Sequence, residues 1–98
     1  MDESIHLAGF TNVKSTQVDI LHKKIGHYAS VFRLKGGTFE ELRLTRKDIG
    51  PSEHPIHDVQ VNLVRGSQVL HASSQDRTVT TAVEQALRLI EDQIAKAQ

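Results

Sequence analysis

The residue types best suited to chemistry lie together in one short stretch, Glu53-His54-Pro55-Ile56-His57-Asp58. Two imidazoles and two carboxylates are nitrogen and oxygen ligands of the kind that bind zinc and other transition metals. However, a proline separates the histidines, a strand is predicted to begin at His57, and no further motif supplies a closing ligand. An ordinary polar loop is therefore the better interpretation, and the sequence predicts no metal site.

No other group of residues forms a recognisable catalytic motif. Ser73 and Ser74 lack the glycine-flanked nucleophile elbow of the hydrolases, and no glycine-rich phosphate loop occurs. His6 and His71 lie on predicted strands, where a hydrogen bond satisfies each ring without any function. The sequence therefore predicts a protein that is not an enzyme and that uses no cofactor or small-molecule substrate.

The length and composition set wide bounds. We expect residues 1–98 to form a single small domain whose core hides roughly two thirds of the unfolded surface. The chain has no cysteine, which excludes disulfides and thiolate metal sites and fits a reducing compartment. It lacks a basic and apolar leader and any run of about 20 apolar residues. We therefore expect a soluble cytoplasmic protein with no membrane partner.

The charges are unevenly distributed along a chain whose formal net charge is zero. Neutrality argues against a generic polyanion-binding protein, because nonspecific affinity for nucleic acid comes mostly from lysine and arginine. From residue 50 onward four bases face six acids, whereas between residues 14 and 47 eight bases face three acids. A basic patch is thus possible in the amino-terminal half, formed by Lys14, Lys23, Lys24, Arg33, Lys35, Arg43, Arg46 and Lys47, with His22 and His27 adding charge at low pH.

The amino-terminal third predicts a strand followed by a helix. An alternating run from Ile5 to Gly9 indicates the strand. Ser15 or Thr16 is the expected N-cap of the helix, which should end near Leu34 because a lysine and two glycines follow. Its apolar residues recur every three or four positions and should pack in a core, the aromatic ones included: Val18, Leu21, Ile25, Tyr28 and Phe32.

The rest of the chain predicts three strands and a second helix. The strands alternate apolar with polar residues, and glycine and proline mark the connections. We expect a strand from about Phe39 to Lys47, a loop from Ile49 to Pro55, a strand from His57 to Val64, a tight turn at Arg65-Gly66-Ser67, a strand from Val69 to Ser73, and a helix from about Val79 to the end, capped by Thr78 or Asp76.

The predicted order of elements is βαβββα, which defines an α+β fold. Both helices have an apolar stripe, and we expect both to pack on the same face of a four-stranded sheet. In the last helix the stripe comprises Val79, Val83, Ala86, Ile90, Ile94 and Ala97. The other face of the sheet should remain in contact with water.

The residues of the carboxyl-terminal half resemble a known family. The segment from Asp58 to Ser73, DVQVNLVRGSQVLHAS, and the helix opening Ala82-Val83-Glu84 are similar to those of ribosome hibernation promoting factors, also called ribosome-associated inhibitors or sigma-54 modulation proteins. The resemblance covers nearly the whole chain, and Gly66 and Ala72 match a turn glycine and a small residue of that family. It indicates a short form, without the carboxyl-terminal domain by which long members pair ribosomes.

The resemblance implies a function and a binding surface. Its members have the βαβββα fold, bind the small ribosomal subunit and its 16S ribosomal RNA in the channel for messenger and transfer RNA, and inhibit translation under stress. Basic residues of the two helices are thought to contact the RNA. Carried over to this chain, the RNA-binding residues would be Lys23, Lys24, His27, Arg88 and Lys96.

This chain departs from the family pattern on that surface. Ser30, Leu89, Asp92 and Ala95 stand where the family tends to place lysine or arginine. Each missing cation releases one fewer counterion on binding, so both the affinity and its salt dependence should be lower.

The lysines and the arginine among these candidates also have simpler interpretations. Lys23 and Lys24 could form only the solvated face of a helix, and Lys96 could only complement a helix dipole. Arg88 lies four residues from Glu84 and three from Glu91, so a surface ion pair is expected.

Two other functions are alternatives. The same fold could serve as a protein-interaction or regulatory module that uses the wet sheet face or the acidic last helix. A double-stranded RNA-binding domain is a weaker alternative, because its last helix begins with a lysine cluster, whereas this one begins Thr78-Val-Thr-Thr-Ala.

Overall fold

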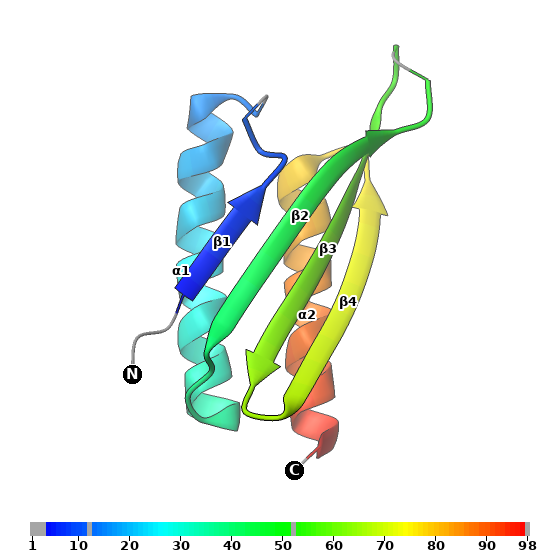
Figure 1. Ribbon diagram of the computed structural model, residues 1–98. Coiled ribbons are helices and arrows are strands. Elements are labelled where there is room, and N and C mark those ends of the chain that lie inside the picture. The colour runs from blue at the N-terminus through cyan, green and yellow to red at the C-terminus, as the bar shows by residue number, and fades with distance from the viewer. Residues whose placement is uncertain (1–3, 12, 52, 98) are drawn as a thin grey trace.

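The computed structural model describes residues 4–11, 13–51 and 53–97 and has the predicted element order (Figure 1). Two helices cover one face of a four-stranded sheet, so the predicted α+β class is confirmed. The elements are β1 (Ser4–Ala8), α1 (Ser15–Gly36), β2 (Glu41–Ile49), β3 (Ile56–Arg65), β4 (Gln68–Asp76) and α2 (Val79–Ala97).

The strands lie in the sheet in chain order, β1-β2-β3-β4. β2, β3 and β4 pair antiparallel through short connections, whereas β1 pairs parallel with β2. Parallel pairing requires a long crossover, and α1 provides it. At the β3–β4 turn, Gly66 has φ 57° and begins a two-residue loop between paired Arg65 and Gln68, as in a type II′ turn.

The core lies between the sheet and the helices and follows the predicted periodicities. Alternate residues of the central strands are fully buried, and so is the apolar stripe of α2 from Val79 to Ile94. In α1 the predicted stripe is buried from Leu21 to Phe32, while Val18 is only half-buried. The largest fully buried side chains include Phe32, Leu21, Leu42, Leu44, Leu63, Leu87, Ile90 and Ile94.

The edge strand β1 is less well covered than its neighbours. Ile5 and Leu7 point to the helix side of the sheet, yet their residues are 44% and 36% exposed. With Ile25 and Gly26 of α1 they line a hollow of about 230 Å³. One flank of the apolar layer is therefore open to solvent.

The predicted N-cap of α1 is wrong. Lys14, rather than Ser15 or Thr16, occupies the cap position, and no side chain caps the helix. Lys14 has an extended backbone (φ −59°, ψ 144°), so its carbonyl accepts the first helical hydrogen bonds from Gln17 and Val18, while Ser15 is already helical. The helix also continues past Leu34 to Gly36 and ends where Gly37, with φ 83°, donates its N–H to the Arg33 carbonyl.

β3 and β4 are longer than predicted, whereas β2 has the predicted length but is shifted by two residues and begins at Glu41 rather than Phe39. β2 runs to Ile49, which the sequence placed in a loop, because Asp48 and Ile49 continue the ladder opposite His57 and Ile56. β4 runs from Gln68 to Asp76 and pairs over its whole length with β3. The sequence did not predict the added residues of β4 because most of their side chains are polar, whereas strand pairing is made by the backbone.

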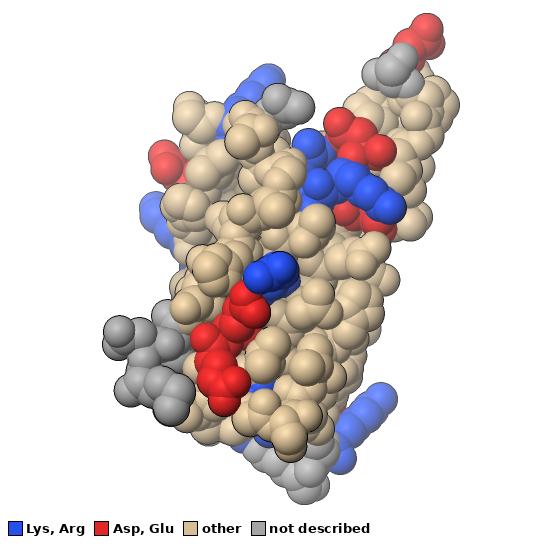
Figure 2. Space-filling view, viewed as in Figure 1, with Lys and Arg blue, Asp and Glu red and all other residues tan. Residues whose placement is uncertain are grey.

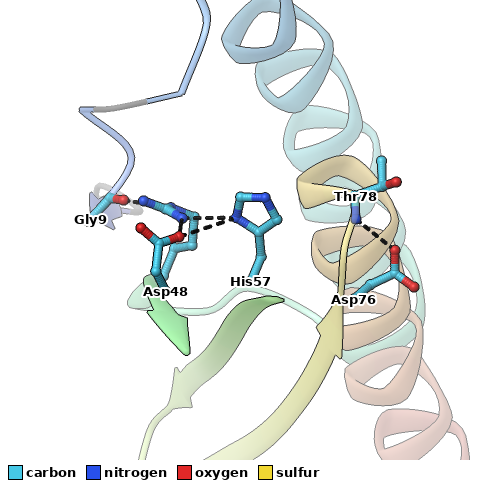
Figure 3. Close-up of polar contacts among 6 residues, drawn as sticks. Gly9, Asp48, His57, Asp76 and Thr78 are labelled. Atoms are coloured by element: carbon cyan, nitrogen blue, oxygen red, sulfur yellow. Dashed lines mark hydrogen bonds and ion pairs between the residues drawn. The ribbon is translucent and has the colours of Figure 1, made fainter. Parts of the chain in front are cut away.

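The cap of α2 is as predicted. The Asp76 carboxylate accepts a hydrogen bond from the Thr78 amide at 2.8 Å (Figure 3). The Thr78 carbonyl accepts one from the Ala82 amide. Asp76 thus satisfies a backbone donor at the point where the chain turns from β4 into the helix.

Candidate nucleic-acid interface

The predicted RNA-binding residues lie on the outer side of the two-helix layer, but only two of them come together. α1 and α2 pack side by side on the sheet, which places Lys24 of α1 beside α2. Lys24 and Arg88 both contact the carboxylate of Glu84. We call the surface along this line between the helices the helix seam, with Lys24, Glu84 and Arg88 at its centre.

The central contact of the helix seam is a short ion pair. Lys24 Nζ lies 2.8 Å from Glu84 Oε1, with side chains that are 32% and 36% exposed. Arg88 Nη2 lies 3.8 Å from the other oxygen of Glu84, so the ion pair expected four residues apart is present. The hydrogen bond from Lys24, and then its charge, lower the pKa of Glu84. The nearby Tyr28 hydroxyl, and less so Glu84, raise the pKa of Arg88.

A second ion pair crosses the helix seam. Lys35 Nζ of α1 lies 2.7 Å from Glu91 Oε2 of α2. The sequence offered Glu91 as a partner for Arg88, and Lys35 was not among the candidate site residues. Helical spacing identifies partners within one helix only, so it could not find a pair between helices. The cations of the helix seam are therefore already paired with carboxylates of the same surface.

The other candidate residues stand apart from this cluster. Lys23 and His27 are exposed on α1, and Lys96 is exposed in the last turn of α2. Within the described ranges Lys23 has no ion-pair partner. The His27 ring contacts Tyr28 edge-on, with ring centroids 5.4 Å apart. Tyr28 and Phe32 are buried and pack against each other, as predicted for core residues.

The structure separates the residues of the histidine-rich stretch. His57 and Asp58 are neighbours in β3, so their side chains point to opposite faces of the sheet. In the described part of the chain no group of three or more histidine, aspartate or glutamate side chains is placed to hold a metal ion.

His57 belongs instead to a polar cluster around Arg46, on the face of the sheet that the helices cover (Figure 3). The Arg46 side chain is only 5% exposed. Its Nε donates to the Gly9 carbonyl at 2.7 Å, and Nη1 lies 2.6 Å from the Asp48 carboxylate and 2.8 Å from His57 Nδ1. This arginine ties the β1–α1 connection to β2 and β3. The sequence counted it only as part of a basic patch.

The open face of the sheet is largely uncharged (Figure 2). Its charges form mixed pairs: Arg43 with Glu41 at 2.8 Å and Lys47 with Asp58 at 3.9 Å. The other polar side chains of this face belong to Thr45, Gln60, Asn62, His71, Ser73 and Gln75.

Comparison with known proteins finds likeness in structure but not in sequence. No protein-family model matches the chain, and no curated protein sequence matches it. A ribosomal subunit interface protein from Coxiella burnetii superposes with a TM-score of 0.69 at 13% identity, covering 96% of each chain. The N-terminal domain of Protein Y from Thermus thermophilus superposes with a TM-score of 0.60 at 14% identity, over 100% of each chain. The expected resemblance is thus confirmed in the fold.

Neither helix of the described chain combines the length and apolar character needed to cross a membrane.

Proposed function

We propose that this chain, which has the fold of the ribosomal subunit interface proteins, binds the small ribosomal subunit and inhibits translation by occupying it. The contact would be with 16S ribosomal RNA in the channel for messenger and transfer RNA, in the cytoplasm and under stress. The structural match over essentially the whole of both chains carries this proposal. It acts by occupancy rather than by chemistry.

The proposed RNA contacts are the basic residues of the helix layer, Lys23, Lys24, His27, Arg88 and Lys96. Lys23 and Lys96 are exposed and can reach phosphates directly. Lys24 and Arg88 must first leave Glu84, so RNA phosphates compete with a carboxylate already in place. Since affinity for RNA comes largely from released counterions, this competition should give weak binding with a shallow dependence of log affinity on log salt concentration.

Sedimentation with purified small subunits and whole ribosomes across a salt series tests the proposal. The protein should co-sediment at low salt and dissociate as salt rises. Replacing Lys23 and Lys24 together by glutamate should release it, because two phosphate contacts become repulsive. The matched control is Arg77→Glu, which should still bind. It makes the same change of charge per residue at an exposed position just before α2.

Two outcomes would contradict the proposal, one concerning the partner and the other the contact surface. If the wild-type protein stays at the top of the gradient at every salt concentration, the ribosome is not its partner. The alternative of a protein-interaction or regulatory module is then favoured, and the ion-paired seam and the mostly uncharged open face suit it. If both variants bind as the wild type does, the ribosome is the partner but the helix layer is not the contact.

A further inference from the structure

The most unusual polar group outside the helix layer is Asp58, a buried carboxylate on the open face of the sheet. Its side chain is only 8% exposed although no helix covers this face. Its contacts are long: Gln60 Nε2 donates to Oδ2 at 3.4 Å, Gln75 Nε2 donates to Oδ1 at 3.3 Å, and Lys47 Nζ lies 3.9 Å away. A carboxylate accepts about four hydrogen bonds, so this one retains acceptor capacity.

Asp58 lines a hollow of about 250 Å³ between β2 and β3, together with Thr45, Lys47, Gln60 and Asn62. Pockets for drug-sized ligands measure about 300–1,000 Å³, so this hollow suits a ligand no larger than one planar base. The cross-strand pairs Thr45↔Gln60 and Lys47↔Asp58 set its walls. Lys47 is 65% exposed and Gln75 is an exposed residue, so both side chains can move when a ligand enters.

The chemistry of these side chains selects one kind of ligand. The two carboxylate oxygens of Asp58 can accept hydrogen bonds from two adjacent N–H groups of a ligand. The ammonium of Lys47 or the amide of Gln60 beside them can donate to an acceptor atom next to those N–H groups. The Watson–Crick edge of guanine presents two adjacent donors, N1–H and N2–H, followed by the acceptor O6. Adenine and cytosine place an acceptor beside their amino group, and uracil has one donor between two acceptors, so each would set a lone pair against the carboxylate.

A guanidinium group also offers two parallel donors, but the surrounding charges disfavour it. Arg43 and Lys47 flank Thr45 on the same face of β2, and both would repel an arginine side chain. The same two cations favour the phosphates that accompany a base.

We propose that the hollow on the open face binds a guanine base. The Asp58 carboxylate accepts hydrogen bonds from N1–H and N2–H, and Lys47 or Gln60 donates to O6. Arg43 and Lys47 lie where they can contact adjoining phosphate groups. The base belongs either to unpaired RNA or to a free guanine nucleotide. This site is separate from the helix layer and does not depend on the helix layer being an RNA contact.

Amide chemical-shift titrations test the proposal on the whole chain. Guanosine monophosphate should shift amides of β2 and β3 and bind at least about tenfold more tightly than the adenosine, cytidine and uridine monophosphates. Inosine monophosphate lacks the N2 amino group and should also bind about tenfold more weakly, because one hydrogen bond to a charged group is lost. This comparison needs no altered protein.

Asp58→Asn should lower guanosine monophosphate affinity at least about tenfold. Asp19→Asn makes the same chemical change at an exposed position of α1 and should have no effect. Pentanucleotides with a central guanine or adenine identify the source. If the guanine pentamer binds and the mononucleotide does not, the base belongs to RNA, and equal affinities indicate a free nucleotide.

Absence of binding by both the mononucleotide and the guanine pentamer would overturn the proposal. Equal affinities for guanosine and inosine monophosphate would overturn it too, as would unchanged affinity in a folded Asp58→Asn protein. None of these results bears on ribosome sedimentation, so the failure of this site and the failure of the proposed function are distinguishable.

Discussion

Glu84 is the residue on which the charge of the helix layer depends. One carboxylate holds a lysine from α1 and an arginine from α2, and both are candidate RNA contacts. Its own pKa is lowered, chiefly by the hydrogen bond from Lys24. A single acid thus decides how much positive charge this surface offers to a polyanion.

Glu84→Gln should strengthen binding to the ribosome if the helix layer is the contact. Glutamine keeps the size of the side chain but frees two cations from a competing charge. Each additional phosphate contact should steepen the dependence of log affinity on log salt concentration by about 0.7–0.9. Sedimentation at a series of salt concentrations measures this slope. Glu53→Gln makes the same change at an exposed position in the β2–β3 connection and should leave the slope as it is.

The ion pair also links stability to pH. Because the folded-state pKa of Glu84 is lowered, its contribution to stability is present above the unfolded-state pKa and is lost as the pH falls through the folded-state value. Lys24→Met should therefore cost a few tenths to about 1 kcal/mol at neutral pH, given the exposure of the pair, and much less in acid. Urea unfolding at both pH values measures the difference. An equal loss at both would show that Lys24 contributes through packing alone.

At the scale of elements, two glycines of α1 should respond in opposite ways to alanine. Gly26 lies in the helix with open space where a Cβ would be, whereas at Gly36 a Cβ would run into the Arg65 guanidinium and the Ile94 side chain. Gly26→Ala should stabilise the protein by about 1 kcal/mol. Gly36→Ala should give no gain or a loss, because the Arg65 side chain and α2 must shift. Denaturant unfolding of the two variants checks the contrast.

The elements themselves were predictable because their apolar residues repeat with the period of the structure. Val59, Val61 and Leu63 alternate on β3, and the α2 stripe recurs at helical spacing. These β3 side chains are buried, and so is the α2 stripe from Val79 to Ile94. The ends of the elements were less predictable. Whether Ile49 pairs with Ile56 depends on a partner strand, and nothing in the local sequence specifies it.

The candidate site was predicted less completely than the fold. Arg88 with Glu84 lies within one helix, so spacing found it. Lys24 with Glu84, Lys35 with Glu91, and the buried Arg46 all depend on packing between elements distant in the chain. Sequence reasoning could identify charged residues, but not which of them neutralise one another.

At the scale of the whole molecule, the fold is shared at 13–14% identity because it depends on the apolar pattern rather than on particular side chains. Function depends on the polar surface residues, which the apolar pattern does not determine. This chain is formally neutral, the centre of its helix seam is paired, and its open face is mostly uncharged. Any affinity for RNA therefore has to come from a few positions rather than from a strong overall field.

The parallel edge strand has a consequence for how the molecule opens. Residues 4–8 reach their partners, residues 41–45, only across the whole of α1, whereas the other strand pairs close through short connections. Contacts between distant parts of a chain carry a higher entropic cost of loop closure, and β1 is thinly covered besides. We expect β1 to dock last in folding and to detach first. Its amides should exchange with deuterium faster than those of β3, and equal protection would mean that the sheet opens only as one unit.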